Sequence, residues 1–218
     1  MVDWAEHAQR EDARYRDGEA RLPEAEDQDS RQRQLTRMGN AAAGAGLARL
    51  MAGNTEEGRE WFARAVERYR ESYELAPPGS WGRPIAILKA RILSGDWEGA
   101  ESDAGWTLEQ GAADAESPVG RYAATLALLV LGRDREARAL ADGLRTRDDF
   151  PAPVADALSY IAGEDTLGYI DAIEAVLESF ETREDYLEDL PAADTVVVLQ
   201  ALATRRGMAA ELSSPLLP

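Results

Sequence analysis

The chain has 218 residues, of which 41 are acidic and 24 basic, giving a net charge of −17. Such an excess of carboxylates cannot neutralise a run of phosphates, which excludes nucleic acid and anionic membranes as expected partners. Cysteine is absent and histidine occurs once, which excludes a disulfide framework, a thiolate nucleophile and a four-ligand zinc site.

The basic residues are unevenly chosen, because arginine supplies all of them except Lys89. An acidic, lysine-poor, cysteine-free composition resembles that of proteins from extreme halophiles, where molar KCl shortens the Debye length to about 3 Å. We expect a halophilic protein in preference to one from a GC-rich mesophile. The chain starts without a basic and apolar leader, and its longest apolar run, 122–131, is shorter than the roughly 20 residues of a bilayer span. A cytoplasmic protein is therefore expected.

The first 33 residues differ from the rest in composition. Residues 2–16 carry Trp4, Ala8 and Tyr15 on helical spacing, which predicts a weakly amphipathic leading helix. Residues 16–33 combine a glycine, a proline and dense charge, which predicts a solvated linker that gives way to helix near Ser30. We therefore expect a leading helix and charged linker over residues 1–29.

Beyond this linker, a glycine followed by polar residues recurs four times between apolar segments. Glycine ends a helix because it reaches the left-handed conformation at little cost. The Asn or Asp that follows can cap the next helix, so a few residues join two antiparallel helices. These junctions lie at Gly53, Gly95, Gly132 and Gly163. The pattern predicts a single helical-repeat domain over residues 30–218.

The helices between these junctions make up an all-α fold of α-α hairpins, about ten helices in total. Small residues at 41–46 favour close approach of the bulky helix that follows, and the run 122–131 is apolar nearly all round, which predicts a central position. The expected spans are 30–52 with 55–75, 81–93 with 97–108, two helices between Ser117-Pro118 and Thr146, 152–162 with 165–180, and a last helix from Pro191 to Gly207 before an irregular tail.

The spacing of the junctions, 42, 37 and 31 residues, scatters around the 34-residue tetratricopeptide period. Most of residues 40–147 resembles the tetratricopeptide repeat family at a limited set of positions, which are Gly46, Phe62 and Ala65 in the first hairpin, Ile87 and Ala100 in the second, and Ala137 in the third. The resemblance implies a superhelix whose concave groove binds another protein. In its register, groove positions include Ile85, Lys89 and Tyr122, and Trp81 is added because tryptophan is enriched at interaction surfaces.

Catalytic patterns are missing from the sequence. The lone histidine, His7, lies in the leading helix and is expected to be a solvated surface residue, and Lys89 follows Leu rather than Gly, so no phosphate-binding loop of the Walker type exists. We assign no catalytic residue, metal ligand or cofactor. One alternative remains: five carboxylates within residues 181–189 could perform acid-base chemistry or hold Mg²⁺, although such clusters also arise by chance in so acidic a chain.

The last third of the chain carries a second resemblance. Residues 165–180, an acidic connector, the segment 194–207 and the terminal Pro-Leu-Leu-Pro of residues 215–218 resemble the end of the all-helical immunity protein forty-nine family. The resemblance implies a cytoplasmic protein that neutralises a cognate toxin by binding it. We therefore expect a non-enzymatic protein-binding module with a basic or neutral protein partner. The alternatives are a carboxylate-based metal-dependent enzyme and a self-associating structural protein.

Overall fold

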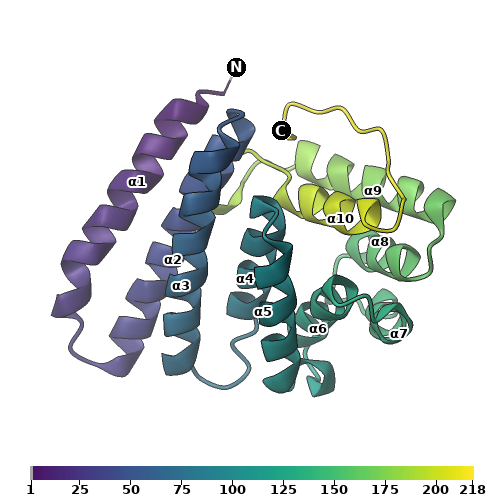
Figure 1. The fold of residues 1–218 in the computed structure, drawn as a ribbon, viewed down its shortest axis with the longest axis horizontal. Helices are drawn as coiled ribbons and strands as arrows, with labels where there is room; N and C mark the ends of the chain where they lie inside the picture. The colour runs from purple at the N-terminus through teal and green to yellow at the C-terminus, as the bar shows by residue number, and fades with distance from the viewer. Residues whose placement is uncertain (1) are drawn as a thin grey trace. The chain divides into compact units, whose positions relative to one another are not determined.

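The computed structural model describes residues 2–218, except for the side chain of Leu187, and every regular element in this part of the chain is a helix. The prediction of an all-α fold is confirmed: the described residues contain ten α-helices and three short 3-10 segments (Figure 1). Contacts divide the chain into unit 1, comprising Met1–Gly95, Asp185–Ala192 and Pro218, and unit 2, comprising Asp96–Glu184 and Ala193–Leu217. The single domain over residues 30–218 stays a prediction.

Unit 1 is a row of helices in which each packs against its neighbour in sequence. Short connections reverse the chain direction between them. The elements are α1 (Trp4–Arg21), η1 (Leu22–Glu24), α2 (Gln28–Met51), α3 (Thr55–Leu75) and α4 (Gly82–Ser94), with η3 (Leu187–Asp189) lying against α2.

The leading helix is longer than predicted, and the linker expected over residues 16–33 is reduced to residues 22–27; the helix predicted to begin near Ser30 begins at Gln28. Helix α1 runs through Gly18, where a side chain would bring its Cβ within 2.5 Å of Met38 Cγ on α2. Gly18 therefore allows α1 and α2 to pack closely, and it does not interrupt α1. Pro23 sits at the start of η1, where no backbone amide is required. Asp27 then caps α2 by accepting a hydrogen bond from the Ser30 amide at 2.6 Å.

Helices α2 and α3 pack as closely as the small residues of α2 predicted. A Cβ on Gly46 would lie 3.0 Å from the Phe62 ring and 3.1 Å from the Gly58 carbonyl oxygen. A Cβ on Gly39 would lie 2.7 Å from the Tyr69 ring. The aromatic side chains of α3 therefore occupy the space that these glycines leave on α2.

Unit 2 continues the pattern of sequential helix packing. Its elements are α5 (Trp97–Glu109), η2 (Ala112–Asp114), α6 (Pro118–Val130), α7 (Asp134–Arg145), α8 (Ala152–Ala162), α9 (Thr166–Glu181) and α10 (Asp194–Thr204). Residues 123–130 of α6 are all buried, and α6 packs against both α5 and α7, so its predicted central position is confirmed within unit 2. Helix α10 contacts α8 and α9, and the irregular tail follows.

Three of the four junction glycines adopt the predicted left-handed conformation, but Gly163 does not. The φ angles of Gly53, Gly95 and Gly132 are 80°, 70° and 67°. Gly163 stays right-handed, and Glu164 takes the positive φ of 52° instead. A Cβ on Gly163 would lie 3.0 Å from the Arg138 guanidinium and 3.3 Å from the Ser159 carbonyl oxygen. Gly163 thus lies against the flexible end of the Arg138 side chain, and Glu164 supplies the left-handed residue of this junction.

Candidate functional site

The four predicted binding residues lie on α4 and α6 or directly before α4. Trp81 precedes α4 and is only 8% exposed, whereas Ile85 and Lys89 on α4 are half-buried. Tyr122 on α6 is half-buried, and its ring centroid lies 5.5 Å from that of Phe150. Three of these residues belong to unit 1 and Tyr122 to unit 2, so one shared groove stays a prediction.

Tyr122 is held in its neutral form. Burial raises the pKa of its hydroxyl group, and the Asp194 carboxylate raises it further because a phenolate beside it would be repelled. The Tyr122 hydroxyl group therefore keeps its proton at neutral pH.

The lone histidine is not the solvated residue that was predicted. His7 on α1 is half-buried beside Trp4, with ring centroids 5.6 Å apart. Its Nδ1 atom is buried and has no hydrogen-bond partner in the described part of the chain.

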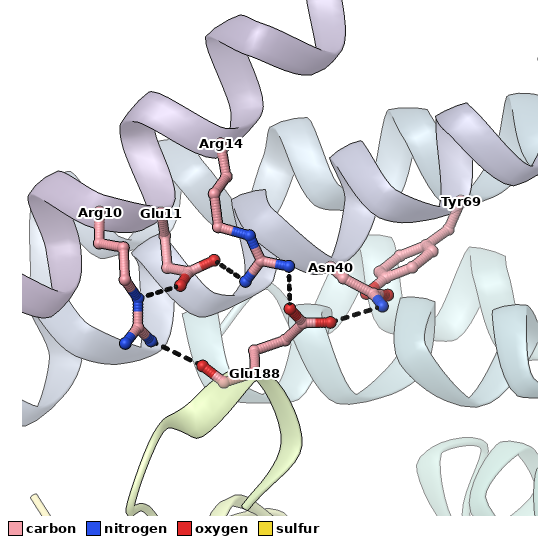
Figure 2. A network of polar contacts seen from close by, with 6 residues as sticks. All are labelled: Arg10, Glu11, Arg14, Asn40, Tyr69 and Glu188. Carbon is pink, nitrogen blue, oxygen red and sulfur yellow. Dashed lines mark hydrogen bonds and ion pairs between the residues drawn. The ribbon is translucent and has the colours of Figure 1, made fainter.

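The acidic connector contributes a polar network to unit 1. In Figure 2, the Glu188 carboxylate reaches Arg14 of α1 and accepts a hydrogen bond of 3.0 Å from Asn40 Nδ2 of α2. The Glu188 carbonyl oxygen accepts a bond of 2.6 Å from Arg10 Nη2. Asn40 Oδ1 in turn accepts a bond of 2.9 Å from the Tyr69 hydroxyl group of α3. Glu188 thus joins α1 to α2 directly, and Asn40 extends the network to α3.

Glu11 lies at the centre of this network and is fully buried. Its two carboxylate oxygens accept hydrogen bonds of 2.9 Å from Arg10 Nε and from Arg14 Nη1 (Figure 2). A buried carboxylate is tolerated because both oxygens are paired with cations. The network is therefore internally satisfied, and it holds elements together.

The carboxylates of the connector are engaged separately. Glu188 binds Arg14 and Asn40, whereas Glu181 Oε1 accepts a hydrogen bond of 2.7 Å from the Ser214 hydroxyl group. Among the described residues, no three His, Asp or Glu side chains come together in a group that could hold a metal ion. The metal-dependent alternative stays a prediction.

Helix α9 carries the most unusual exposed face of the molecule. Leu167, Asp171, Glu174 and Glu178, spaced by four, three and four residues, are all exposed and lie on one side of the helix. We call these four residues the α9 ridge. The opposite side, including Tyr169 and Ile173, packs into unit 2.

Two properties distinguish the α9 ridge. Leu167 is 78% exposed, a much larger fraction than Val119 at 45%, the other large apolar side chain exposed in the described residues. Helix α9 contains no basic residue, and Asp171, Glu174 and Glu178 make no ion pair within residues 2–218. The ridge thus combines unpaired negative charge with an exposed apolar side chain.

The ridge opposes the stability of its own helix. The pairs Asp171 with Glu174 and Glu174 with Glu178 are like charges at helical spacing, and each costs roughly 0.2–0.5 kcal/mol. Glu178 also lies near the carboxyl end of α9, where the helix dipole disfavours negative charge. The spacing of these acids was readable from the sequence, but the exposure of Leu167 was not, because it depends on which face unit 2 buries.

The chain matches no protein-family model, no curated protein and no solved structure in three comparisons. In the described residues, no helix combines the length and the apolar character that crossing a bilayer demands. The tetratricopeptide and immunity-protein resemblances therefore stay predictions that depend on the residues quoted for them.

Proposed function

We propose that this protein is a non-enzymatic binding module that receives a basic protein partner on the α9 ridge. The observation that carries the proposal is the row of three unpaired carboxylates beside the exposed Leu167. A complementary partner would present Lys or Arg side chains spaced along one surface, with an apolar residue at one end to cover Leu167.

The charge of the surrounding unit supports a basic partner. Unit 2 contains 22 acidic and 9 basic side chains, a net charge of −13 out of the chain's −17. A field of this sign accelerates the encounter with a cationic protein, while burial of apolar surface at Leu167 would slow its release. The carboxylates of the α9 ridge would therefore raise the association rate, and Leu167 would lower the dissociation rate.

A narrower form of the proposal makes the partner a toxin. It is supported by the resemblance of the last third of the chain to the immunity protein forty-nine family, because that third includes both α9 and α10. Finding a toxin gene directly upstream of the gene for this protein would strengthen this form. If the neighbouring genes have unrelated functions, the narrower proposal of a toxin partner is rejected, and the general proposal of a basic protein partner remains.

The test uses two sets of isosteric substitutions. The ridge variant carries Asp171→Asn, Glu174→Gln and Glu178→Gln. The matched control carries Glu60→Gln, Glu67→Gln and Glu74→Gln, which removes three exposed carboxylates from one side of α3 in unit 1. Both variants lose the same charge, so they separate the ridge itself from the net charge of the protein.

Each tagged protein is used to isolate partners from the native source, at both 0.5 M and 2 M KCl. We expect one stoichiometric protein with the wild type and the control, less of it with the ridge variant, and weaker retention at higher salt. Light scattering on the purified protein tests self-association. Recovery of no partner, equal recovery with the ridge variant, or a dimer that the ridge variant abolishes would each refute the proposal.

A further inference from the structure

A pocket of about 390 Å³ opens at the corner of α1, η1 and α2 in unit 1. Its wall includes three arginines, Arg21, Arg33 and Arg37, together with Ser30, Gln34 and a single carboxylate, Glu24. We call it the arginine pocket. A wall with three cations and one anion is unexpected in a chain whose acidic residues outnumber the basic ones by 41 to 24.

The guanidinium groups of this pocket are loosely held. Arg21 pairs with Asp17 at 3.1 Å and Arg33 pairs with Asp29 at 2.6 Å, but all four side chains are mostly exposed. Exposed pairs of this kind contribute little net stability, so either arginine can turn to a ligand at small cost. The exposed Arg37 side chain makes no hydrogen bond or ion pair within residues 2–218.

The backbone places these side chains together. Ser30, Arg33 and Arg37 follow one another by three and four residues, so they share one side of α2. Arg21 ends α1, and the capped start of α2 fixes the turn between the two helices. Gln34, whose Nε2 donates to the Gly18 carbonyl oxygen at 3.2 Å, joins α2 to α1 beside the pocket.

We infer that the arginine pocket binds a phosphate monoester dianion. The lining side chains alone carry a net charge of +2, and Asp17 and Asp29 pair with Arg21 and Arg33 from outside the lining. A dianion that displaces these exposed pairs would meet three guanidinium groups, of which Arg37 is the one that has no ion pair within the described residues to give up. Planar guanidinium groups bind phosphate oxygens through paired hydrogen bonds. The pocket volume falls in the range of small-molecule sites and exceeds what one phosphate fills, so the phosphate is attached to a larger group. One isolated phosphate is compatible with a chain too acidic for a run of them.

The first test measures binding of inorganic phosphate to the full chain by calorimetry in 0.3 M KCl, with helicity checked by circular dichroism. The substitution Arg37→Gln should weaken binding by at least about tenfold, because it removes a charged hydrogen-bond donor. The matched control is Arg31→Gln, an exposed arginine of the same helix that lies outside the pocket. Absence of binding, or equal weakening by both substitutions, would overturn the inference.

A second measurement examines the charge of the ligand. Between pH 7.5 and 5.5 a phosphate monoester dianion takes up one proton and becomes a monoanion, so its affinity should fall, while sulfate remains a dianion and should bind equally at both values. Acetate binding as tightly as phosphate would contradict recognition of a dianion. Titrations with glucose 6-phosphate and with a phosphoserine peptide then identify the source, since the pocket should favour the one whose attached group it also contacts.

Discussion

Unit 1 holds 15 basic and 19 acidic side chains, whereas unit 2 holds 9 and 22, so net charges of −4 and −13 divide the chain's −17 unequally. In unit 1, charges join helices: Arg49 of α2 donates two hydrogen bonds, of 3.0 and 2.8 Å, to Asp12 of α1. In unit 2, the apolar α6 supplies the centre, and many carboxylates face solvent. Carboxylates also join helices in unit 2, as Asp156 of α8 does with Arg145 of α7, but the surplus of acidic over basic side chains there is much larger.

The largest difference between unit 1 and unit 2 is expected when salt is removed. Dilution from 2 M to 0.1 M KCl lengthens the Debye length from less than 3 Å to about 10 Å, which restores repulsion among the surplus carboxylates. We expect helicity to fall and the helices of unit 2 to open before those of unit 1. Circular dichroism measures the loss, and hydrogen exchange with mass spectrometry locates it. Uniform exchange across both units, or unchanged helicity, would contradict the halophilic interpretation.

The next largest effect is expected at the centre of the unit 1 network. Glu11→Ala leaves Arg10 and Arg14 without their buried carboxylate, and we expect the free energy of unfolding to fall by about 2–4 kcal/mol. The exposed Glu174→Ala is the control, with a change within about 0.5 kcal/mol. Urea unfolding in 2 M KCl provides both values. Equal losses would show that the network does not stabilise unit 1.

A smaller effect is expected at Arg83, an arginine that binds neutral oxygens. Its Nε donates to the Ser72 hydroxyl oxygen at 2.7 Å and its Nη2 to Thr36 and Gln32, and burial lowers its pKa. Arg83→Met should cost about 1–2 kcal/mol of unfolding free energy, because Ser72 retains its bond to the Gln32 carbonyl oxygen. Arg83→Lys should not restore the loss, since an ammonium group cannot reproduce the planar fork. Full rescue by lysine in urea unfolding would show that charge alone matters.

The helices and most of their ends could be predicted from neighbouring residues. The predictions that failed concern contacts between residues far apart in the sequence. The turns at Gly95 and Gly132 could be predicted because the residues beside these glycines suffice to end one helix and start another. Gly18 instead allows a close approach to Met38, and at the Gly163 junction Glu164 takes the positive φ. The residues beside these two glycines reveal neither outcome. The same reasoning applies to the insertion of Glu188, a residue far along the chain, between α1 and α2.

Only part of the α9 ridge could be predicted from the sequence. The spacing of Asp171, Glu174 and Glu178 already indicates one helical face. The exposure of Leu167 and the absence of an arginine within reach depend on how α9 packs in unit 2. The predicted residues on α4 depended on a repeat register, and this register says nothing about how deeply Trp81 is buried.

The α9 ridge sharpens the comparison because its charges should destabilise unit 2. Glu174→Gln with Glu178→Gln removes both repulsive pairs, so the free energy of unfolding should rise by about 0.5 kcal/mol in 0.1 M KCl. The gain should vanish in 2 M KCl, where the repulsion is screened. Glu67→Gln on α3, a helix with interspersed arginines, is the control and should show no gain. A loss of stability in this double variant would mean that the Glu174 and Glu178 carboxylates have stabilising contacts.

The smallest effect separates two kinds of carboxylate. The pKa of Asp27 is lowered because the Ser30 backbone amide donates to it, and the pKa of Glu136 is lowered because the exposed Arg133 guanidinium donates to it. Both groups stabilise the folded state above their unfolded pKa, near 4, and this contribution is lost as pH falls through the lower folded value. Raising KCl from 0.1 to 2 M should move the pKa of Glu136 towards its ordinary value, because salt screens an exposed ion pair. The pKa of Asp27 should hardly move, since its principal donor is a fixed backbone amide. Carboxyl-carbon NMR titrations of both residues measure the difference, and equal salt shifts would show that the helix cap in unit 1 is as sensitive to screening as the surface pair in unit 2.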